Sequence, residues 1–370
     1  MKISFLCFDL SDNSLGRAAL LAQALSGHYE VELIGTAKRN EIWYPLKESS
    51  LPVRQFPWKR YPAFLCTLRE ILKAADGDVL FACKLRPASF GIALLKKWQT
   101  GKPLLVDIDD WELGFFYHSG LWGKLGRFLN LTNPNGLPYT WLMEKLVGFA
   151  DGITVSNRFL QNRFSGEVLY HCRDTSILNP DKYDPAKIKQ RLGLESKKIV
   201  MFLGTPRGHK GVGDLIESMA LVRAPSAHLI IVGESSSLAA HDRVTFVPKI
   251  PFAELGEYLS AADVVVVPQR QTSDTVGQMP AKIFDAMSMG KPIISTGVSD
   301  IEEVLGGHGY FFEPGNVRQL ADTIDYVLEH EEEARLKGQK VRERCMKLYD
   351  IRILENQLLG LVKKFDKNPD

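Results

Sequence analysis

The segment GTPRGHKG, residues 204–211, places an arginine, a histidine and a lysine between glycines, directly after the apolar run at 199–203. A short apolar run followed by glycines predicts a buried strand that turns into a helix. Backbone N–H groups at such a junction bind anions, and Arg207 and Lys210 add a planar guanidinium and a mobile ammonium. Three residues apart and opening the next helix, the two cations are spaced to hold a diphosphate. A glycine turn with solvated basic residues is the alternative, and we do not expect His209 to be catalytic.

A second segment, DTVGQMPAKIFDAMSMGKPII at 274–294, carries further groups that could meet the same ligand. Pro280 can begin a helix, and the glycine and proline near residue 290 end it before an apolar strand. The first turns of this helix hold Lys282 and Asp285. The Asp285 carboxylate could accept hydrogen bonds from a ribose diol, whereas an ordinary helix charge is the structural alternative.

A third segment, DIDDWE at 107–112, gathers carboxylates where a predicted strand ends. Such a cluster is costly at the carboxyl end of a parallel strand unless it binds something. Asp109 could orient or deprotonate an acceptor hydroxyl, and Asp107, Asp110 and the nearby His118 could help to bind that acceptor. A metal site is one alternative. A structural role, as helix caps or as partners of lysine or arginine, is another.

These segments belong to an alternation of short apolar runs and helical patterns that fills the chain. The 370 residues exceed what one hydrophobic core usually supports, so two domains are expected. The alternation predicts α/β architecture with doubly wound parallel sheets. We expect strands near 2–8, 31–35, 78–82, 103–108, 152–156 and 167–171, and a second series from 199 onward.

The polar, proline-containing stretch 178–198 interrupts the alternation and predicts the linker between the domains. The expected divisions are therefore an N-terminal acceptor-binding domain over 1–180 and a nucleotide-sugar-binding domain over 195–345. The tail 346–370 repeats apolar residues at helical spacing. It predicts an amphipathic helix that packs back toward the N-terminal domain.

Composition narrows the class of protein. Hydrophobic residues make up 45% and charged residues 24%, and the formal net charge of +2 gives no reason to expect a nucleic-acid partner. The five cysteines are scattered, without CxxC or metal-binding spacing, which predicts reduced thiols in a cytoplasmic protein. The sequence has neither a secretory signal nor a run of eighteen apolar residues, so we expect no membrane span.

The order and spacing of GTPRGHKG, HLIIVG, VTFVPKIPFAELGEYLSAADVVVVPQ and PAKIFDAMSMGKPII resemble the nucleotide-sugar domain of retaining GT-B glycosyltransferases of family 4. The resemblance covers most of residues 150–330 and is weaker before them. It implies two Rossmann-like domains facing a central cleft and a nucleoside-diphosphate sugar as co-substrate. No permanently bound cofactor and no metal are implied.

The resemblance also implies roles for individual residues. Arg207 and Lys210 would bind the donor diphosphate, Asp285 the ribose, and the backbone around Val247 to Ile250 the base. The glycine of SDNSLGRAALLAQAL at 11–25 would let the backbone approach the donor phosphates, although a plain strand-to-helix turn fits as well. The expected donor-binding set is Gly16, Arg17, Gly204, Val247, Lys249, Gly277, Gln278, Lys282 and Asp285, and Asp109 joins Arg207 and Lys210 as catalytic.

Two positions depart from the family pattern. The family usually has two glutamates eight positions apart, the first of which contacts the donor sugar, but this chain has Gly277 and Asp285. Gln278 or backbone N–H groups at 276–279 could replace the missing carboxylate.

The segment 111–131 has apolar residues on one helical face and basic residues on the other. Leu121, Trp122, Leu125, Phe128 and Leu129 share the apolar face. Such a helix suits a membrane interface, and the first 190 residues hold 24 Lys+Arg against 19 Asp+Glu. Core packing is the alternative.

The sequence therefore predicts a retaining glycosyltransferase that moves a sugar from a nucleotide sugar to an acceptor hydroxyl. The expected acceptor is a lipid-linked or cell-envelope glycan at the cytoplasmic face of a membrane. Two alternatives remain: a sugar-nucleotide epimerase of similar architecture, and a non-catalytic partner of another glycosyltransferase, which Gly277 keeps open.

Overall fold

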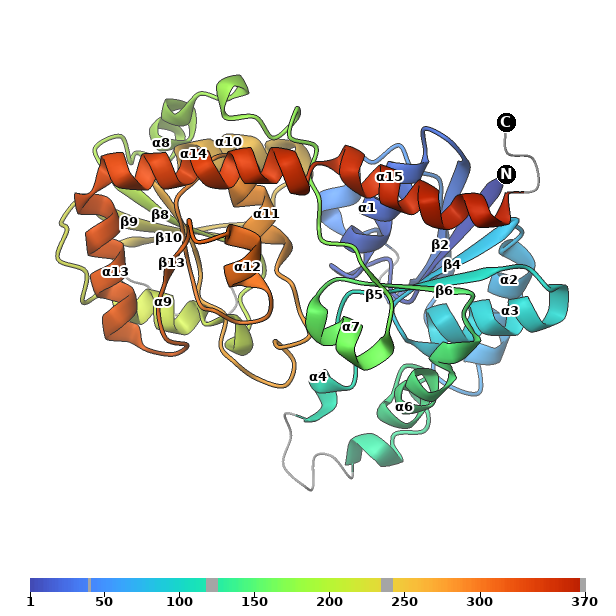
Figure 1. Cartoon of the computed structure of the whole chain (residues 1–370). Coiled ribbons are helices and arrows are strands. Elements are labelled where there is room, and N and C mark those ends of the chain that lie inside the picture. The colour runs from blue at the N-terminus through green and yellow to red at the C-terminus, as the bar shows by residue number, and fades with distance from the viewer. Residues whose placement is uncertain (39–40, 118–125, 234–241, 367–370) are drawn as a thin grey trace. The chain divides into compact units, whose positions relative to one another are not determined.

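The computed structural model describes residues 1–38, 41–117, 126–233 and 242–366, which fold into two compact units (Figure 1). Unit 1 comprises Met1–Tyr170, Val276–Met279 and Arg352–Asp370. Unit 2 comprises His171–Thr275 and Pro280–Ile351. Each unit has its own parallel sheet and its own buried apolar core.

The sheet of unit 1 has seven strands in the order β3-β2-β1-β4-β5-β6-β7, and every pairing is parallel. The central strands are almost entirely buried and mostly apolar, as expected of strands covered on both faces. The strands are β1 (Lys2–Cys7), β2 (Glu30–Ala37), β3 (Val53–Pro57), β4 (Val79–Cys83), β5 (Leu104–Ile108), β6 (Gly152–Val155) and β7 (Glu167–Val168).

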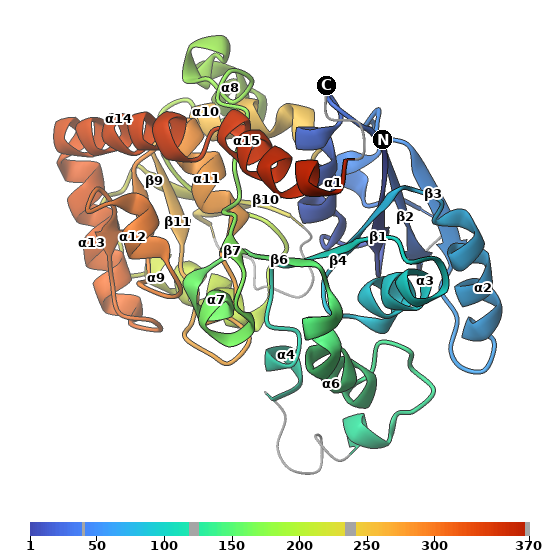
Figure 2. The same cartoon turned by 45° about the vertical axis from the view of Figure 1, so that its right-hand side comes forward.

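The helices of unit 1 connect and cover these strands. Helices α2 and α3 contact each other and lie side by side in Figure 2. The unit contains α1 (Leu15–Leu25), α2 (Phe64–Ala74), α3 (Ile92–Thr100), α4 (Gly114–Tyr117), α6 (Leu137–Leu146) and α7 (Arg158–Phe164), together with nearly all of α15 (Ile351–Val362).

The sheet of unit 2 has six parallel strands in the order β10-β9-β8-β11-β12-β13. Its central strand β8 (Lys198–Leu203) ends directly before the glycine-rich segment 204–211. The other strands are β9 (Ala227–Val232), β10 (Val244–Val247), β11 (Val264–Val267), β12 (Ile293–Ser295) and β13 (Tyr310–Phe311).

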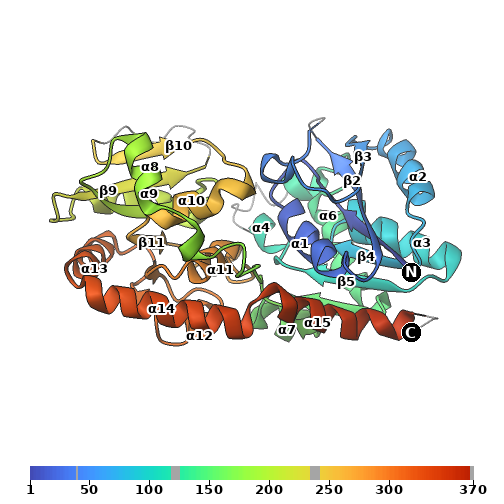
Figure 3. The same cartoon turned by 90° about the horizontal axis from the view of Figure 1, so that it is seen from above.

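Helices cover this second sheet as well, and α14 packs on α11, as Figure 3 shows. The unit contains α8 (Pro185–Leu192), α9 (Val212–Met219), α10 (Leu255–Ala261), α11 (Ala281–Ser288), α12 (Ile301–Leu305), α13 (Val317–Glu329) and α14 (Glu331–Leu348). No helix in the described ranges is long and apolar enough to cross a membrane.

The fold class expected from the sequence, two Rossmann-like parallel-sheet domains, is confirmed. The stretch 178–198 differs from the expected linker, because it forms α8 and belongs to unit 2. The Asp184 side chain accepts a hydrogen bond from the Ala186 N–H at the start of this helix, and Gly193 ends it in the left-handed conformation. The chain instead passes from unit 1 to unit 2 between Tyr170 and His171.

Candidate functional site

The segment 204–211 in unit 2 differs in one respect from the expectation. Arg207 and Lys210 do not open the helix: Gly208–Lys210 forms a short 3-10 turn, and α9 begins only at Val212. Gly211 separates the two with φ of 65°, and a Cβ there would overlap the carbonyl oxygen of Pro268. Only glycine satisfies both conditions.

Lys210 and Lys282 are the cations that meet at the end of β8. The Lys210 ammonium donates to the Thr205 carbonyl oxygen at 3.2 Å. The Lys282 ammonium lies 3.9 Å from the centre of the Phe202 ring and 3.3 Å from where a Cβ of Gly204 would stand. Gly204 therefore leaves the room that this lysine occupies. Arg207 is exposed on the same segment.

The surroundings of Lys282 disfavour its charge. Burial lowers its pKa well below the ordinary value, Lys210 lowers it further, and Asp285 opposes the shift. A desolvated ammonium beside a second ammonium is unfavourable until an anion arrives. The arrangement can therefore bind a ligand carrying concentrated negative charge.

Asp285 is buried in α11 and pairs with Arg173, whose Nε donates to Oδ1. Arg173 is itself fixed by its backbone, which exchanges hydrogen bonds of 2.9 Å with Tyr349 and Ile351. Sequence reasoning missed Arg173. The ion pair fixes the direction of the carboxylate that we expected to bind ribose.

Gly277 belongs to the short segment of unit 1 at Val276–Met279 and packs against Trp111. A Cβ at this position would lie 2.5 Å from the Trp111 Cβ and 3.1 Å from its backbone nitrogen. Trp111 is held in turn by Glu144, which accepts from its indole N–H at 3.1 Å, and by the Arg163 guanidinium 4.7 Å above its ring. The glycine at the family's glutamate position is thus a packing requirement of this chain.

In unit 1, Arg17 and Asp107 form a buried bidentate pair with N–O distances of 2.9 and 3.1 Å. Arg17 also donates to the carbonyl oxygens of Leu169 and Tyr170, and Thr154 donates to Asp107 at 2.7 Å. These bonds join α1 to β5 and to the end of the sheet. Arg17 and Asp107, expected at the donor and the acceptor, thus both take part in the packing of the unit, and their contact with either ligand stays a prediction.

Asp109 and Asp110 lie beyond β5 and share Lys84, which follows β4 and which sequence reasoning missed. The Lys84 ammonium lies 2.7 Å from Asp109 Oδ1 and 3.3 Å from Glu112 Oε1, and it also pairs with Asp110. Burial raises the pKa of Asp109 to about 7, although Lys84 opposes the rise. Lys84 follows a predicted strand just as DIDDWE does, so the same strand-end rule could have found it.

The other expected site residues lie as follows. Gly16 is in the first turn of α1, its N–H donating to Asn13, and Gln278 is partly buried beside Gly277. Val247 ends β10 and its carbonyl accepts from Gly233 at 2.9 Å, while Lys249 is partly exposed just beyond. His118 lies outside the described residues. No group of three His, Cys, Asp or Glu within the described ranges is placed to hold a metal ion.

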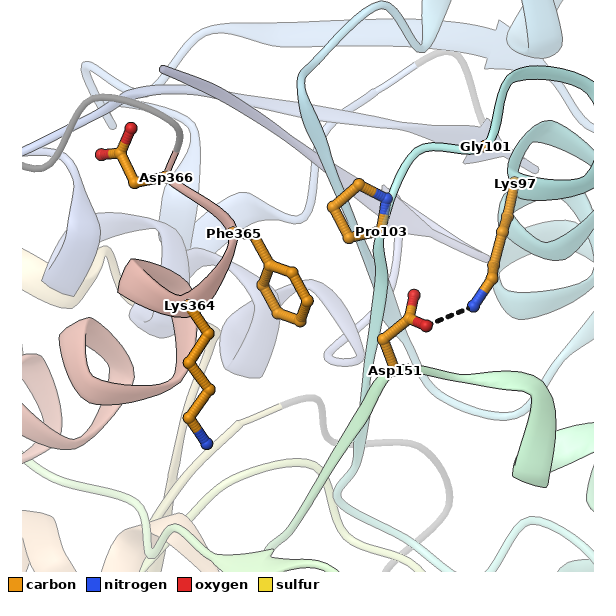
Figure 4. Close-up of a pocket in the computed structure, with 7 residues that line it drawn as sticks. All are labelled: Lys97, Gly101, Pro103, Asp151, Lys364, Phe365 and Asp366. Carbon is orange, nitrogen blue, oxygen red and sulfur yellow. Dashed lines mark hydrogen bonds and ion pairs between the residues drawn. The ribbon is translucent and has the colours of Figure 1, made fainter.

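A shallow pocket of about 350 Å³ in unit 1 lies at the other edge of the sheet (Figure 4). Pro103 and Asp151 line it and precede β5 and β6, so it faces the amino ends of these strands. The Asp151 carboxylate forms an ion pair with the Lys97 ammonium at 2.6 Å and accepts a hydrogen bond from the Leu104 N–H. Ligands of open α/β sheets bind at the carboxyl ends, where the charged residues described above gather.

Comparison with known proteins agrees with this architecture. The profile of the family described as Glycosyl transferases group 1 matches residues 197–330. Residues 197–330 are therefore similar to a glycosyltransferase group 1 domain. The chain is 30% identical over 176 residues to N-acetyl-alpha-D-glucosaminyl L-malate synthase of Bacillus anthracis, covering 44% of each protein. It is 22% identical over 317 residues to D-inositol 3-phosphate glycosyltransferase of Frankia alni, covering 75% of this chain and 74% of that one.

Solved structures extend the likeness in fold to nearly the whole glycosyltransferase-like chain. HepE of Anabaena, solved with UDP and glucose, has a TM-score of 0.76 at 16% identity. The superposition covers 98% of this chain and 100% of HepE. A sucrose-phosphate synthase from Thermosynechococcus elongatus has a TM-score of 0.74 at 17% identity, with 98% of both chains covered. The expected GT-B fold is confirmed. In sequence, the chain aligns with under half of the length of the Bacillus anthracis relative.

We predict that Gly277→Ala lowers the stability of the protein by about 1–3 kcal/mol, because the added methyl group overpacks against Trp111. Glutamate at this position should cost at least as much. The matched control is Gly213→Ala in α9, where a Cβ meets nothing within 4 Å. That change should leave stability unchanged or raise it by up to about 1 kcal/mol. Thermal and urea unfolding compare the two, and equal stability of both variants would contradict the packing argument.

We predict that Lys282→Met raises the stability of the ligand-free protein by about 1 kcal/mol, or about 2–4 °C in Tm. A lysine whose pKa is lowered by folding costs stability below the lowered pKa, and the cost fades as the pH rises toward 10.5. The gain in Tm should therefore be largest at neutral and acid pH and small near pH 10.

Lys291→Met is the matched control. Burial lowers the pKa of Lys291 to about 8, but its ammonium donates to the carbonyl oxygens of Ser260 and Ala262 at 2.7 and 2.9 Å. Its removal should cost about 1–3 kcal/mol, because buried acceptors lose their partner. A Lys282→Met variant that loses stability to a similar extent would show that Lys282 serves packing.

Proposed function

We propose that this protein is a retaining glycosyltransferase that transfers a sugar from a nucleoside-diphosphate sugar to an acceptor hydroxyl. The observation that carries the proposal is the pair of ammonium groups of Lys210 and Lys282 beyond β8. The Lys282 ammonium is desolvated, and within the described residues no carboxylate lies at ion-pair distance from it. A diphosphate would supply negative charge beside the desolvated Lys282 ammonium. The similarity to a group 1 domain and the fold shared with a protein solved with UDP-glucose support the same ligand class.

In the proposed reaction, the bond between the anomeric carbon and the diphosphate oxygen breaks, and the diphosphate leaves with the electron pair. Lys210 and Lys282, with Arg207 beside them, offset the charge that grows on the diphosphate. The acceptor oxygen forms the new bond to the anomeric carbon on the face that the diphosphate leaves, so that the configuration is retained, and its proton passes to the Asp109 carboxylate. Asp285, oriented by Arg173, holds the ribose through Oδ2, and the backbone beyond Val247 contacts the base.

The absence of a side chain at Gly277 affects which groups can contact the donor sugar. Because Trp111 occupies the space of any side chain there, we propose that Gln278 and the backbone N–H groups at 276–279 contact the sugar in place of a carboxylate. Hydrogen bonds from N–H groups suit hydroxyl or carbonyl oxygens of the donor sugar.

We further propose that the acceptor is a lipid-linked or cell-envelope glycan met at the inner membrane surface. Phe128 and Leu129 are 55% and 64% exposed on the helical residues 126–129, and Leu131 follows them. Trp141 and Leu142 on α6 are exposed as well. Exposed aromatic and apolar side chains of this kind suit the interface of a bilayer. Part of the segment 111–131 lies outside the described residues.

The donor proposal predicts that one of UDP, GDP, dTDP, CMP or ADP raises the Tm of the wild-type protein. Ligand at a hundred times its Kd adds about 2.7 kcal/mol. Arg207→Ala, Lys210→Ala and Lys282→Met should each weaken or abolish the shift. Lys187→Ala, which removes an exposed ion pair with Glu257, should keep it. No shift with any nucleotide at millimolar concentration would overturn the donor site and favour a non-catalytic partner protein.

The membrane proposal predicts that the protein binds phosphatidylcholine vesicles that contain an anionic lipid, measured by co-sedimentation. The double variant Phe128→Ser/Leu129→Ser should bind about tenfold more weakly, because it removes apolar area worth at least about 1.4 kcal/mol. Leu65→Ser, which changes an exposed leucine on α2, should bind as the wild type does. Equal binding by all three proteins would remove this surface from the interface.

A further inference from the structure

Lys84 has an unusual backbone for a lysine. Its φ of 73° places it in the left-handed region, which costs a side-chain-bearing residue about 1–2 kcal/mol. Three hydrogen bonds hold it there: its N–H donates to the Asp107 carbonyl at 2.8 Å, and its carbonyl accepts from the Arg86 N–H at 2.9 Å and from Ser89 Oγ at 2.8 Å. Strain retained by such a framework marks a side chain whose direction matters.

The Lys84 side chain ends among three carboxylates. Lys84 is buried, and its ammonium meets Asp109, Asp110 and Glu112. Burial alone would lower the pKa of Lys84, but these carboxylates raise it well above its ordinary value. The lysine therefore stays charged throughout the physiological range.

The three carboxylates are not equivalent. Glu112 has a second cation, Arg86, which donates to it and is anchored to the Asn135 carbonyl at 2.8 Å. Asp110 is partly exposed to water. Asp109 is nine-tenths buried, and Lys84 is the cation that lies at ion-pair distance from it. Among the described residues, Lys84 is therefore the cation that favours the charged form of Asp109.

The remaining charges around Asp109 oppose its ionisation. Asp110 and Asp107 raise its pKa from the same segment, and Asp107 is itself paired with Arg17. The Cys83 thiol lies next to this group on β4 and stays protonated, because its pKa is raised. From β6 the neutral side chain of Ser156 donates to the Asp109 backbone carbonyl at 2.7 Å.

We propose that Lys84 is a positioning residue that directs the Asp109 carboxylate and keeps it ionised enough to accept the proton of the acceptor hydroxyl. The inference rests on the proposed function for its catalytic meaning. In the step itself the acceptor O–H bond breaks, the proton passes to an Asp109 oxygen, and the oxygen keeps the electron pair that bonds to the anomeric carbon. Without Lys84, Asp109 would hold its proton near neutral pH and the step would lose its base.

The test begins with the free protein and needs no substrate. The infrared absorption of protonated carboxyl groups is followed against pH in the wild type and in Asp109→Asn, and the difference between them isolates Asp109. In the wild type this signal should titrate near pH 7. In Lys84→Met it should move up by at least about one pH unit, which is a tenfold change in the proton affinity. In Lys84→Arg, which keeps the charge, it should return close to the wild-type position.

The catalytic readout is the pH profile of nucleotide-sugar turnover, with water or a glycan as acceptor. Its acid limb should move with the infrared titration in Lys84→Met and return in Lys84→Arg, while the nucleotide-induced Tm shift stays unchanged. An Asp109 signal that titrates at the same pH in all three proteins would overturn the inference. If Lys84→Met does not fold, Lys84→Gln together with Lys84→Arg gives the same comparison. A shifted signal without any nucleotide binding would leave Lys84 with its role and refute the proposed function instead.

Discussion

A buried ammonium group must either pair with negative charge or lose its proton. The two units of this chain satisfy that constraint in different ways, and the difference explains how their charged residues are arranged. In unit 1, Lys84 is surrounded by three carboxylates, so its charge is fixed. In unit 2, Lys282 has an aromatic ring on one side and a second lysine nearby, so its charge is disfavoured. The first arrangement is complete within the chain, whereas the second favours an external anion.

The same constraint separates packing residues from candidate site residues. Arg17 and Asp107 satisfy each other with good geometry and with further partners at the end of the sheet. A pair of this kind stabilises one arrangement of strands and helix. Removing either member would leave the other as a buried charge without its partner. Asp109, two residues further along, has a raised pKa because burial disfavours its charge more than Lys84 favours it. Perturbed groups at strand ends are where chemistry is found most often in such folds.

Steric packing accounts for Gly277, one of the two positions at which the chain departs from the glutamate pair of the family that it resembles. Gly277 and Trp111 lie 166 positions apart in the sequence, yet the Cβ and backbone nitrogen of Trp111 stand where any side chain at 277 would begin. Glu144 and Arg163 keep the indole in place. The absence of a side chain at position 277 therefore has a packing reason within this chain.

The sequence by itself determined the architecture, because the period of apolar residues and the positions of glycine and proline report local conformation directly. It also indicated the strand ends at 107–112 and 204–211, since charged residues there stand out against buried apolar runs. The edge strand β3 was not predicted, because it is only partly buried and its residues lack a continuous apolar run. Only the tertiary structure decided which charge meets which. Lys84 with Asp109, Arg173 with Asp285 and Trp111 with Gly277 join residues far apart in the chain, and no local pattern encodes a contact made by folding.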